Sequence, residues 1–363
     1  MSDQSTSKTA ATSPTDPAAV VSEHDQGRNR RPSRAPAPTP LVKPRALRKG
    51  DTIGIIAPSS PMFEEGEIEF AFQWLAKIGL KYKIGKHVFK TYSDYAGQDE
   101  ARAEDFHTIW SDPDVDAVVP LRGGNGAARI LPLLDFELIK SKPKLFVGYS
   151  DITALHVPIH QRTRLVTFYG PMAASFFKSS YSYHYFTKAV MSTRAIGLIA
   201  DPVPNEVWSP VYPPPRLIIA EGKARGRLTG GCLTLVRQLE GTPYALDTKD
   251  KLLFLEDLEE EPHAIDRILS QLLLAGKLQQ AAGILIAECV SCKPGDSHRN
   301  VLHLNHSVER VLHERLGNLG IPVVYGLRFG HGKDQFTVPY GVSAMLEASR
   351  GKVRFRIEES ACH

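Results

Sequence analysis

The amino-acid sequence predicts an α/β protein that contains a parallel β-sheet. Short apolar runs rich in β-branched residues, typical of buried strands, alternate with segments whose apolar residues recur at helical spacing. Such alternation favours βαβ units, in which the strands are parallel. Hydrophobic residues make up 42% and charged residues 23% of the 363 residues, as in ordinary globular proteins. This composition excludes a collagen-like, coiled-coil or fully disordered chain.

The first strand is expected at residues 52–57, because this β-branched run ends at Pro58. A helix is expected over 64–78, because its apolar residues have helical spacing and Gly79 follows where a helix C-cap belongs. The later elements of this half are strands at 80–84, 117–121 and 144–147, and helices at 99–110, 126–134 and 151–160.

A second group of elements begins near residue 221. Its expected strands lie at 224–228, 252–255, 284–287 and 322–325, its helices at 230–240, 262–275 and 306–316, and a closing hairpin turns at 349–352. We interpret the aromatic-rich and proline-rich segment 176–220 as a crossover linker. The sequence therefore predicts an N-terminal α/β domain at 41–175 and a C-terminal domain at 221–360.

Residues 1–40 are predicted to form a disordered tail, because they contain six prolines and no aromatic residue that could anchor a core. Residues 1–50 hold nine Lys or Arg and four Asp or Glu, a net +5, whereas the whole chain carries +4. The rest of the chain is thus near neutral, so we expect no nucleic-acid partner. No apolar run approaches the roughly 18 residues that span a bilayer, and the N-terminus lacks the apolar core of a secretory signal. We therefore expect no membrane association.

The four cysteines are too few for a disulfide scaffold in a chain of this length, and they fit a reducing cytosol best. Cys289 and Cys292 form a single CxxC motif. A structural zinc site usually needs four ligands, and no second pair follows. We interpret the pair as two thiols that follow a buried strand, with a zinc or redox role as the alternative, and we expect no metal site.

A turn between a predicted strand and a predicted helix holds the first candidate for catalysis. The strand at 144–147 leads into Gly148-Tyr-Ser-Asp151, and a helix follows. This pattern resembles a nucleophile elbow, in which a sharp turn exposes a serine hydroxyl beside the helix N-terminal amides. The usual G-x-S-x-G motif lacks its second glycine, because Ile152 stands there. Ser150 is therefore a candidate nucleophile, and the alternative is that it only caps the helix.

A glycine-rich loop, Arg122-Gly-Gly-Asn-Gly126, follows the strand at 117–121. Its glycines permit close approach of the backbone and offer N–H groups to an anion. The spacing does not match the G-x-G-x-x-G of dinucleotide-binding loops. One interpretation is an oxyanion hole, with one N–H from this loop and one from Asp151. The other is a tight turn that needs glycine.

Two further candidates follow strands of the second half. Glu256 directly follows the run at 252–255, and a carboxylate at the end of a buried strand is well placed to orient an imidazole. The alternative is that Glu256 is only the first residue of an acidic surface segment. His331 lies between two glycines, which favours a surface or catalytic role over a core role. With Ser150 these residues occur in the order serine, acid, histidine. In such a triad the serine attacks, the histidine removes its proton and the acid fixes the histidine tautomer.

Eight ordered segments, spread over roughly residues 41–357, resemble the LD-carboxypeptidase family of serine peptidases, also called muramoyltetrapeptide carboxypeptidases. The segments are GDTIGIIAP at 50–58, RGGNG at 122–126 with LPLLD at 131–135, GYSDITAL at 148–155, TFYGPM at 167–172, GRLTGG at 226–231, LFLED at 253–257, IDRIL at 265–269 and GH at 330–331.

The resemblance implies a role for each candidate. Ser150 would be the nucleophile, Glu256 and His331 would complete the triad, and the backbone N–H groups of Gly123 and Asp151 would be the oxyanion donors. It also implies a flavodoxin-like N-terminal α/β domain that bears the serine, and a smaller mixed α/β C-terminal domain that bears the acid and the histidine.

Two positions depart from the family pattern. Asn125 stands where the family loop usually has a tyrosine, and Cys232 stands where the family usually has an asparagine. Both lie in expected active-site loops. Together with Arg122 and Arg328, cations that could hold a substrate carboxylate, they are substrate-binding candidates.

The resemblance further implies a cytoplasmic, homodimeric serine carboxypeptidase that needs no metal or cofactor. Its substrates would be murein tetrapeptides, from which it releases terminal D-Ala by cleaving after meso-diaminopimelate or L-Lys, as in peptidoglycan recycling. Two alternatives stay open. One is a peptidase of the microcin C immunity type, which cleaves an amide in a peptidyl or aminoacyl nucleotide. The other is an inactive family member that binds peptidoglycan fragments.

Overall fold

Two β-sheets organise the part of the chain that the structure describes. The structure is a computed structural model and describes residues 40–64, 66–176, 179–203, 216–295 and 307–363. Residues 40–363 form one compact unit. The predicted disordered tail lies almost wholly outside the described residues. None of the helices in the described ranges has the length and apolar character needed to cross a membrane.

The first sheet is built from strands of the N-terminal half with one addition from near the C-terminus. Its strands are β1 (Thr52–Ile56), β2 (Lys81–Ile84), β3 (Ala117–Pro120), β4 (Leu145–Gly148), β5 (Phe168–Tyr169) and β12 (Val338–Pro339). They lie in the order β12-β5-β4-β3-β1-β2, and all neighbours are parallel except β12 and β5. The order 2-1-3-4-5 of the parallel strands is that of the flavodoxin-like fold, which confirms the predicted α/β class.

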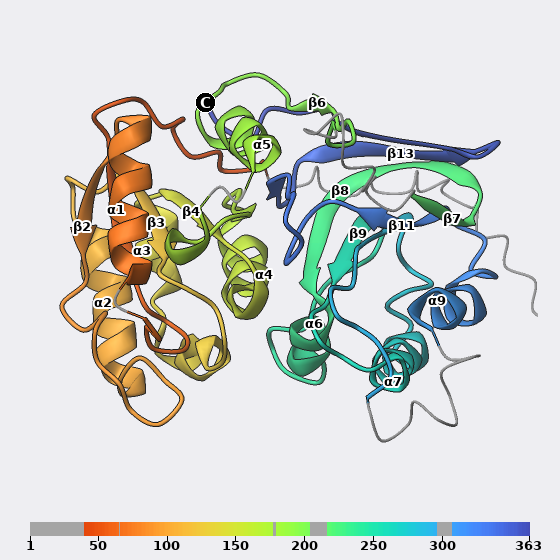
Figure 1. Cartoon of the computed structure of the whole chain (residues 1–363), viewed down its shortest axis with the longest axis horizontal. Coiled ribbons are helices and arrows are strands. Elements are labelled where there is room, and N and C mark those ends of the chain that lie inside the picture. The colour runs from red at the N-terminus through yellow and green to blue at the C-terminus, as the bar shows by residue number, and fades with distance from the viewer. Residues whose placement is uncertain (1–39, 65, 177–178, 204–215, 296–306) are drawn as a thin grey trace, which may run out of the picture. The chain divides into compact units, whose positions relative to one another are not determined.

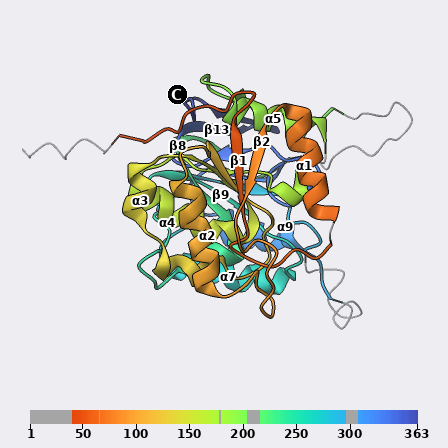
Figure 2. The same ribbon diagram turned by 90° about the vertical axis from the view of Figure 1, so that its left-hand side faces the viewer.

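Helices cover both faces of this sheet. They are α1 (Gly66–Ile78), α2 (Asp99–Ser111), α3 (Phe136–Ser141) and α4 (Thr153–Thr163). Figure 2 shows β1 and β2 between α1 on one side and α2 on the other. Helix α1 buries Ile68, Ala71, Leu75 and Ile78, which recur at helical spacing. The predicted alternation of strands and helices is thus present, and it places the loops that follow the strands along one edge of the sheet.

The prediction of an α-helix over 126–134 is wrong in the type of helix. Residues Ala127–Leu133 form a 3-10 helix that contains Pro132. Proline has no backbone N–H and clashes with the preceding turn, which disfavours a regular α-helix here. A separate helix, α3, starts afterwards, where the Asp135 side chain accepts hydrogen bonds from the N–H groups of Glu137 and Leu138.

The second sheet is mixed. Among the described residues it contains β6 (Gly197–Leu198), β7 (Leu217–Ala220), β8 (Gly222–Cys232), β9 (Lys251–Glu256), β10 (Gly283–Ala287), β11 (Val323–Leu327), β13 (Ser343–Ser349) and β14 (Lys352–Ile357), in the order β6-β14-β13-β8-β9-β10-β11-β7. Strands β8 to β11 are parallel, and the outer pairings are antiparallel. Figure 1 shows α6 (Leu233–Leu239), α7 (Pro262–Leu274) and α9 (Val308–Leu316) together along one face of this sheet.

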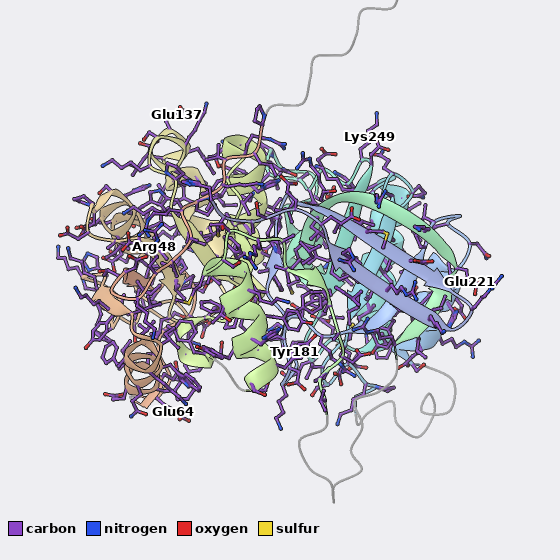
Figure 3. The ribbon with its side chains drawn as sticks, turned by 90° about the horizontal axis from the view of Figure 1, so that it is seen from above. Arg48, Glu64, Glu137, Tyr181, Glu221 and Lys249 are labelled. Atoms are coloured by element: carbon purple, nitrogen blue, oxygen red, sulfur yellow. The ribbon has the colours of Figure 1, made fainter. Side chains whose placement is uncertain are left out.

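The segment 176–220, interpreted as a linker, contains regular structure where it is described. Helix α5 (Ser180–Val190) begins at Ser179, whose side chain accepts from the Ser182 N–H. The hydroxyl of Tyr181 on this helix, labelled in Figure 3, donates to the carbonyl of Ala200 at 2.9 Å. Strands β6 and β7 join the two edges of the second sheet. The described parts of the segment are therefore folded elements.

Candidate active site

Three side chains from distant parts of the sequence form one hydrogen-bonded chain. The Nε2 atom of His331 lies 3.0 Å from the Oγ of Ser150, and its Nδ1 lies 2.7 Å from Oε2 of Glu256. Glu256 is 1% exposed, so its carboxylate faces the imidazole rather than water. Thus the structure brings together the three residues that the sequence singled out as nucleophile, base and acid.

The backbone of Ser150 has the strained geometry of a nucleophile elbow. Ser150 lies two residues after the end of β4 and has φ 62°, in the left-handed region that side-chain-bearing residues rarely adopt. A residue that caps a helix normally has extended backbone, and the residue before α4 is Ile152. The capping alternative for Ser150 therefore does not fit, and its conformation is of the kind found at functional sites.

Glycine lets the histidine loop lie against the catalytic strand. Gly330 has φ 82°, and a Cβ atom there would lie 2.5 Å from the carboxylate of Glu256. Any larger residue would push His331 away from the acid. Glu256 itself is the last residue of β9, so the rigid sheet fixes the position of the carboxylate.

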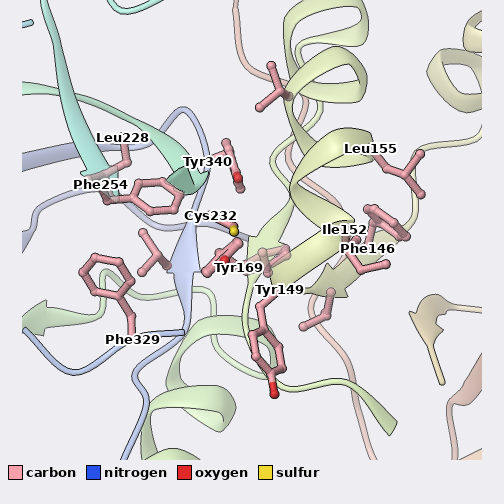
Figure 4. Close-up of a cluster of buried hydrophobic side chains, with 14 of the residues drawn as sticks. Phe146, Tyr149, Ile152, Leu155, Tyr169, Leu228, Cys232, Phe254, Phe329 and Tyr340 are labelled. Carbon is pink, nitrogen blue, oxygen red and sulfur yellow. The ribbon is translucent and has the colours of Figure 1, made fainter. Parts of the chain in front are cut away.

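Tyr169, which the sequence analysis did not single out, connects the acid to the nucleophile. Its hydroxyl donates to Oε1 of Glu256 at 2.5 Å and accepts from the backbone N–H of Ser150 at 3.0 Å. The side chain is fully buried, and burial raises the pKa of its phenol well above the usual value. Figure 4 shows Tyr169 in the buried cluster with Tyr149, Cys232 and Tyr340. No local pattern in the sequence marks it, because β5 (Phe168–Tyr169) is only two residues long.

The two predicted oxyanion donors lie beside the nucleophile. A Cβ atom on Gly123 would stand 3.3 Å from Oγ of Ser150, a tight contact that glycine avoids. Asp151 follows Ser150 directly. Its buried side chain accepts hydrogen bonds from the Ser59 hydroxyl at 2.7 Å and from the Ala127 N–H at 2.8 Å. These two hydrogen bonds connect the loops that follow β1, β3 and β4. Burial raises the pKa of the Asp151 carboxyl group.

A pocket of about 440 Å³ opens beside Ser150 and His331. Among the substrate-binding candidates, Arg122 and Cys232 line it, whereas Asn125 and Arg328 are not among its lining residues. Asn125 is exposed and donates its backbone N–H to Ser60. Arg328 pairs with Glu288 at 2.5 Å and lines a different pocket.

Two contacts hold the side chain of Arg122 at the pocket. Its Nη1 lies 2.9 Å from Glu67, and its guanidinium stacks 3.6 Å from the centre of the Phe63 ring. Its Nε is buried and has no partner among the described residues. The two contacts orient the side chain at the pocket, where its guanidinium offers positive charge to an anion.

Acidic side chains form the opposite part of the lining. Asp257 accepts from the N–H and hydroxyl of Thr234 and from the N–H of Leu258, and the Cys232 thiol lies 3.6 Å away. Burial raises the pKa of Asp257 to about 6. Glu260 lines the pocket on the same segment. Because Glu67 already offsets Arg122, the described lining carries an excess of negative charge near neutral pH.

A buried acid, a histidine and a serine on a strained strand-to-helix turn, in hydrogen-bonding contact, define a serine hydrolase. Comparison with known proteins gives the family. Residues 53–170 match the model of the LD-carboxypeptidase N-terminal domain, and residues 225–346 match the model of the LD-carboxypeptidase C-terminal domain. The chain belongs to the LD-carboxypeptidase family and is a serine-type carboxypeptidase, as the sequence resemblance predicted.

Relatives and solved structures extend this result. The chain is 40% identical over 307 residues to a probable murein peptide carboxypeptidase of Bacillus subtilis, covering 85% of this chain and 92% of the relative. It superposes on muramoyltetrapeptide carboxypeptidase from Oxalobacter formigenes with a TM-score of 0.71 at 28% identity, covering 85% of this chain and 99% of the other. The microcin C7 self-immunity protein MccF in complex with aspartyl sulfamoyl adenosine gives a TM-score of 0.78 at 25% identity, covering 89% and 100%.

Proposed function

We propose that this enzyme hydrolyses the LD-peptide bond that releases terminal D-Ala from murein tetrapeptides. The observation that carries this proposal is the Ser150–His331–Glu256 chain, which faces a pocket that combines one oriented arginine with an excess of carboxylates. The relatives named as murein peptide and muramoyltetrapeptide carboxypeptidases support it.

The catalytic cycle follows from the geometry. Ser150 Oγ attacks the scissile carbonyl while Nε2 of His331, 3.0 Å away, takes its proton. Glu256 accepts the Nδ1–H of His331 and stabilises the imidazolium. The backbone N–H groups of Gly123 and Asp151 hold the oxyanion. The proton on His331 then passes to the amine of D-Ala, which leaves, and a water activated by His331 hydrolyses the acyl-enzyme.

Charge in the pocket favours a substrate with both a carboxylate and an ammonium group. The terminal carboxylate of D-Ala can pair with the guanidinium of Arg122, which lines the pocket. The ammonium group of diaminopimelate or L-Lys can pair with Asp257 or Glu260. An aminoacyl nucleotide also combines an ammonium group with an anionic linkage, so the preference for the murein substrate rests on the relatives named as murein peptide and muramoyltetrapeptide carboxypeptidases.

The experiment is release of free alanine from an L-Lys or diaminopimelate tetrapeptide that ends in D-Ala, compared with the diastereomer that ends in L-Ala. We expect fast release from the D-Ala peptide and slow release from the L-Ala peptide, because a misplacement of about 1 Å at the carbonyl can cost ~100-fold in rate. Equal rates would indicate a broader peptidase. Cleavage of aspartyl sulfamoyl adenosine with no release of alanine would favour the microcin-type function. Binding of the tetrapeptide without any hydrolysis would favour the inactive binder.

We also propose that the enzyme acts in the cytoplasm as a homodimer. The four cysteines, all free thiols in the structure, support a reducing compartment. The dimer is inferred from the family resemblance. Light scattering on the purified protein should give twice the 40.1 kDa chain mass, and a single-chain mass would contradict the dimer.

A further inference from the structure

The CxxC motif closes a tight turn immediately after β10. The backbone N–H of Cys292 donates to the carbonyl of Cys289 at 3.4 Å, and Ser291 between them has φ 57°. Such a hydrogen-bonded turn brings its first and last Cα atoms within about 7 Å. Disulfides usually join Cα atoms about 4.4–6.8 Å apart. The backbone therefore already holds Cys289 and Cys292 at a separation that a disulfide can bridge.

This turn is bonded to the segment that follows the catalytic acid. Val290 donates its N–H to the carbonyl of Asp257 at 3.1 Å and accepts from the N–H of Glu259 at 2.8 Å. Val290 and Leu258 also form a parallel β-bridge. Leu258 and Glu260 line the pocket beside Ser150. The CxxC turn thus lies directly behind one wall of the substrate pocket.

The two thiols are chemically unequal. The thiols of Cys289 and Cys292 lie near the carbonyls of Ala287 and Val290, at 3.9 and 3.6 Å. The neighbouring Cys289 thiol lowers the pKa of Cys292, whereas the proximity of Cys292 and burial raise the pKa of Cys289. Burial also raises the pKa of Cys232 and of Cys362. Because the thiolate is the reactive form, Cys292 is the most nucleophilic of the four cysteines.

Small molecules can reach the pair. A pocket of about 500 Å³, distinct from the one beside Ser150, is lined by both Cys289 and Cys292. Cys292 is half-buried rather than enclosed, and Lys293 next to it also lines the pocket. The charged lining residues balance, with Lys293 and Arg328 against Glu288 and Glu309, so the pocket can admit a small peptide disulfide whose own charges are mixed.

We propose that Cys289 and Cys292 form a reversible dithiol–disulfide site that reacts with small peptide disulfides. The thiolate of Cys292 attacks one sulfur of the disulfide, forms a mixed disulfide and releases one thiolate of the reagent. Cys289 then loses its proton, attacks the sulfur of Cys292 and releases the second thiol. The protein dithiol is oxidised and the reagent disulfide is reduced to two thiols. A dithiol reductant reduces the protein disulfide back to two thiols and is itself oxidised to a disulfide.

The site is expected to affect hydrolysis, a consequence that rests on the proposed function. Formation of the disulfide pulls the two sulfurs together and removes the contact of the Cys292 thiol with the carbonyl of Val290. The turn is bonded to Asp257 and Glu259, so its movement displaces Leu258 and Glu260 in the wall of the substrate pocket. Oxidation should therefore lower kcat/KM for the tetrapeptide, and a dithiol should restore it.

The test exposes the folded full-length protein to oxidised glutathione and follows the tryptic peptide 278–299, which contains both cysteines, by mass spectrometry. In the wild type its mass should fall by about 2 Da, the loss of two hydrogens. Cys289→Ser should instead trap a glutathione adduct on Cys292, and Cys292→Ser should form neither product. The peptide that contains Cys362 is the internal control and should stay unmodified.

The outcomes separate the two claims. An unchanged peptide 278–299 in the wild type, or equal labelling of Cys289→Ser and Cys292→Ser, would overturn the dithiol site. A disulfide that forms without any change in D-Ala release would contradict only its effect on the active site. If the disulfide forms on oxidation but the reduced enzyme hydrolyses no tetrapeptide, only the proposed function is contradicted.

Discussion

Tyr169 shows at the scale of one residue how the fold supports the chemistry. One hydroxyl bonds both the carboxylate of Glu256 and the backbone of Ser150. The Tyr169 hydroxyl therefore holds the acid in place relative to the nucleophile. Its two hydrogen-bond partners are Glu256 and Ser150, not the imidazole of His331. Ser150, Glu256 and His331 could be predicted as catalytic residues from the sequence, because each lies in a recognisable local pattern. Tyr169 has no such pattern, since its role depends on contacts across 87 residues.

We predict that Tyr169→Phe lowers kcat and leaves KM nearly unchanged. A hydrogen bond to a charged group is worth about 1.5–3 kcal/mol, which corresponds to a loss of about 10- to 100-fold in rate. Tyr340→Phe is the matched control, because it removes an equally buried hydroxyl that bonds the carbonyl of Gly230 instead. Steady-state kinetics of D-Ala release measure both variants. Equal losses in the two variants would mean that Tyr169 acts only through packing.

Helix α4 shows at the scale of an element why some structure was predictable and some was not. Its start after the Gly148-Tyr-Ser-Asp turn is a local signal, and the helix is present. Helix α5 also has a local signal, since its buried residues recur at helical spacing: Ser182, Tyr185, Phe186, Ala189 and Val190. The polar and aromatic composition of the segment concealed that spacing. Strand β12, by contrast, is two residues long and pairs across the chain with β5, so no local pattern predicts it.

Two histidines of α4 should make stability depend on pH. Burial lowers the pKa of His156 to about 3 and that of His160 to about 4, from an ordinary value of 6.5. The unfolded chain therefore binds more protons than the folded chain between about pH 4 and 6.5, so stability is lost as the pH falls through this range. Above about pH 6.5 both states hold neutral imidazoles, and this contribution is constant.

The measurement compares urea unfolding of the wild type with that of a His156→Gln, His160→Asn double variant. The replacements keep a donor toward the carbonyls of Gly148 and Leu165, to which the imidazoles bond. The wild type should lose several kcal/mol more than the variant between about pH 7 and pH 5. Asp151 and Asp257, whose pKa values are raised, act in the opposite direction in both proteins. Parallel pH profiles would refute the assignment to these histidines.

At the scale of the whole molecule, the active site is assembled from both sheets. Ser150 and Tyr169 follow strands of the first sheet, whereas Glu256 and His331 follow strands of the second. The family resemblance predicted this division of the triad. Arg328 lies close to His331 in the sequence, which suggested a place in the substrate pocket. Its side chain pairs with Glu288, just after β10, and this contact could not be predicted from the sequence.

Removing the N-terminal segment should leave catalysis unchanged. Residues 1–39 contain prolines and no aromatic anchor, so we expect no contribution to the pocket. We predict equal kcat and KM for D-Ala release by the full chain and by a variant that begins at Pro40. A large rise in KM on deletion would show that the segment reaches the substrate.

The catalytic role of Ser150 is tested most directly by the initial rate of D-Ala release from a murein tetrapeptide by the wild type and by Ser150→Ala. The substitution removes the attacking oxygen and leaves His331 and Glu256 in place. Circular dichroism and the unfolding midpoint verify that the variant is folded. Residues of a triad act as a unit, so the rate should fall by about 10³-fold or more. A folded Ser150→Ala protein that keeps more than about a tenth of the wild-type rate would contradict the serine mechanism.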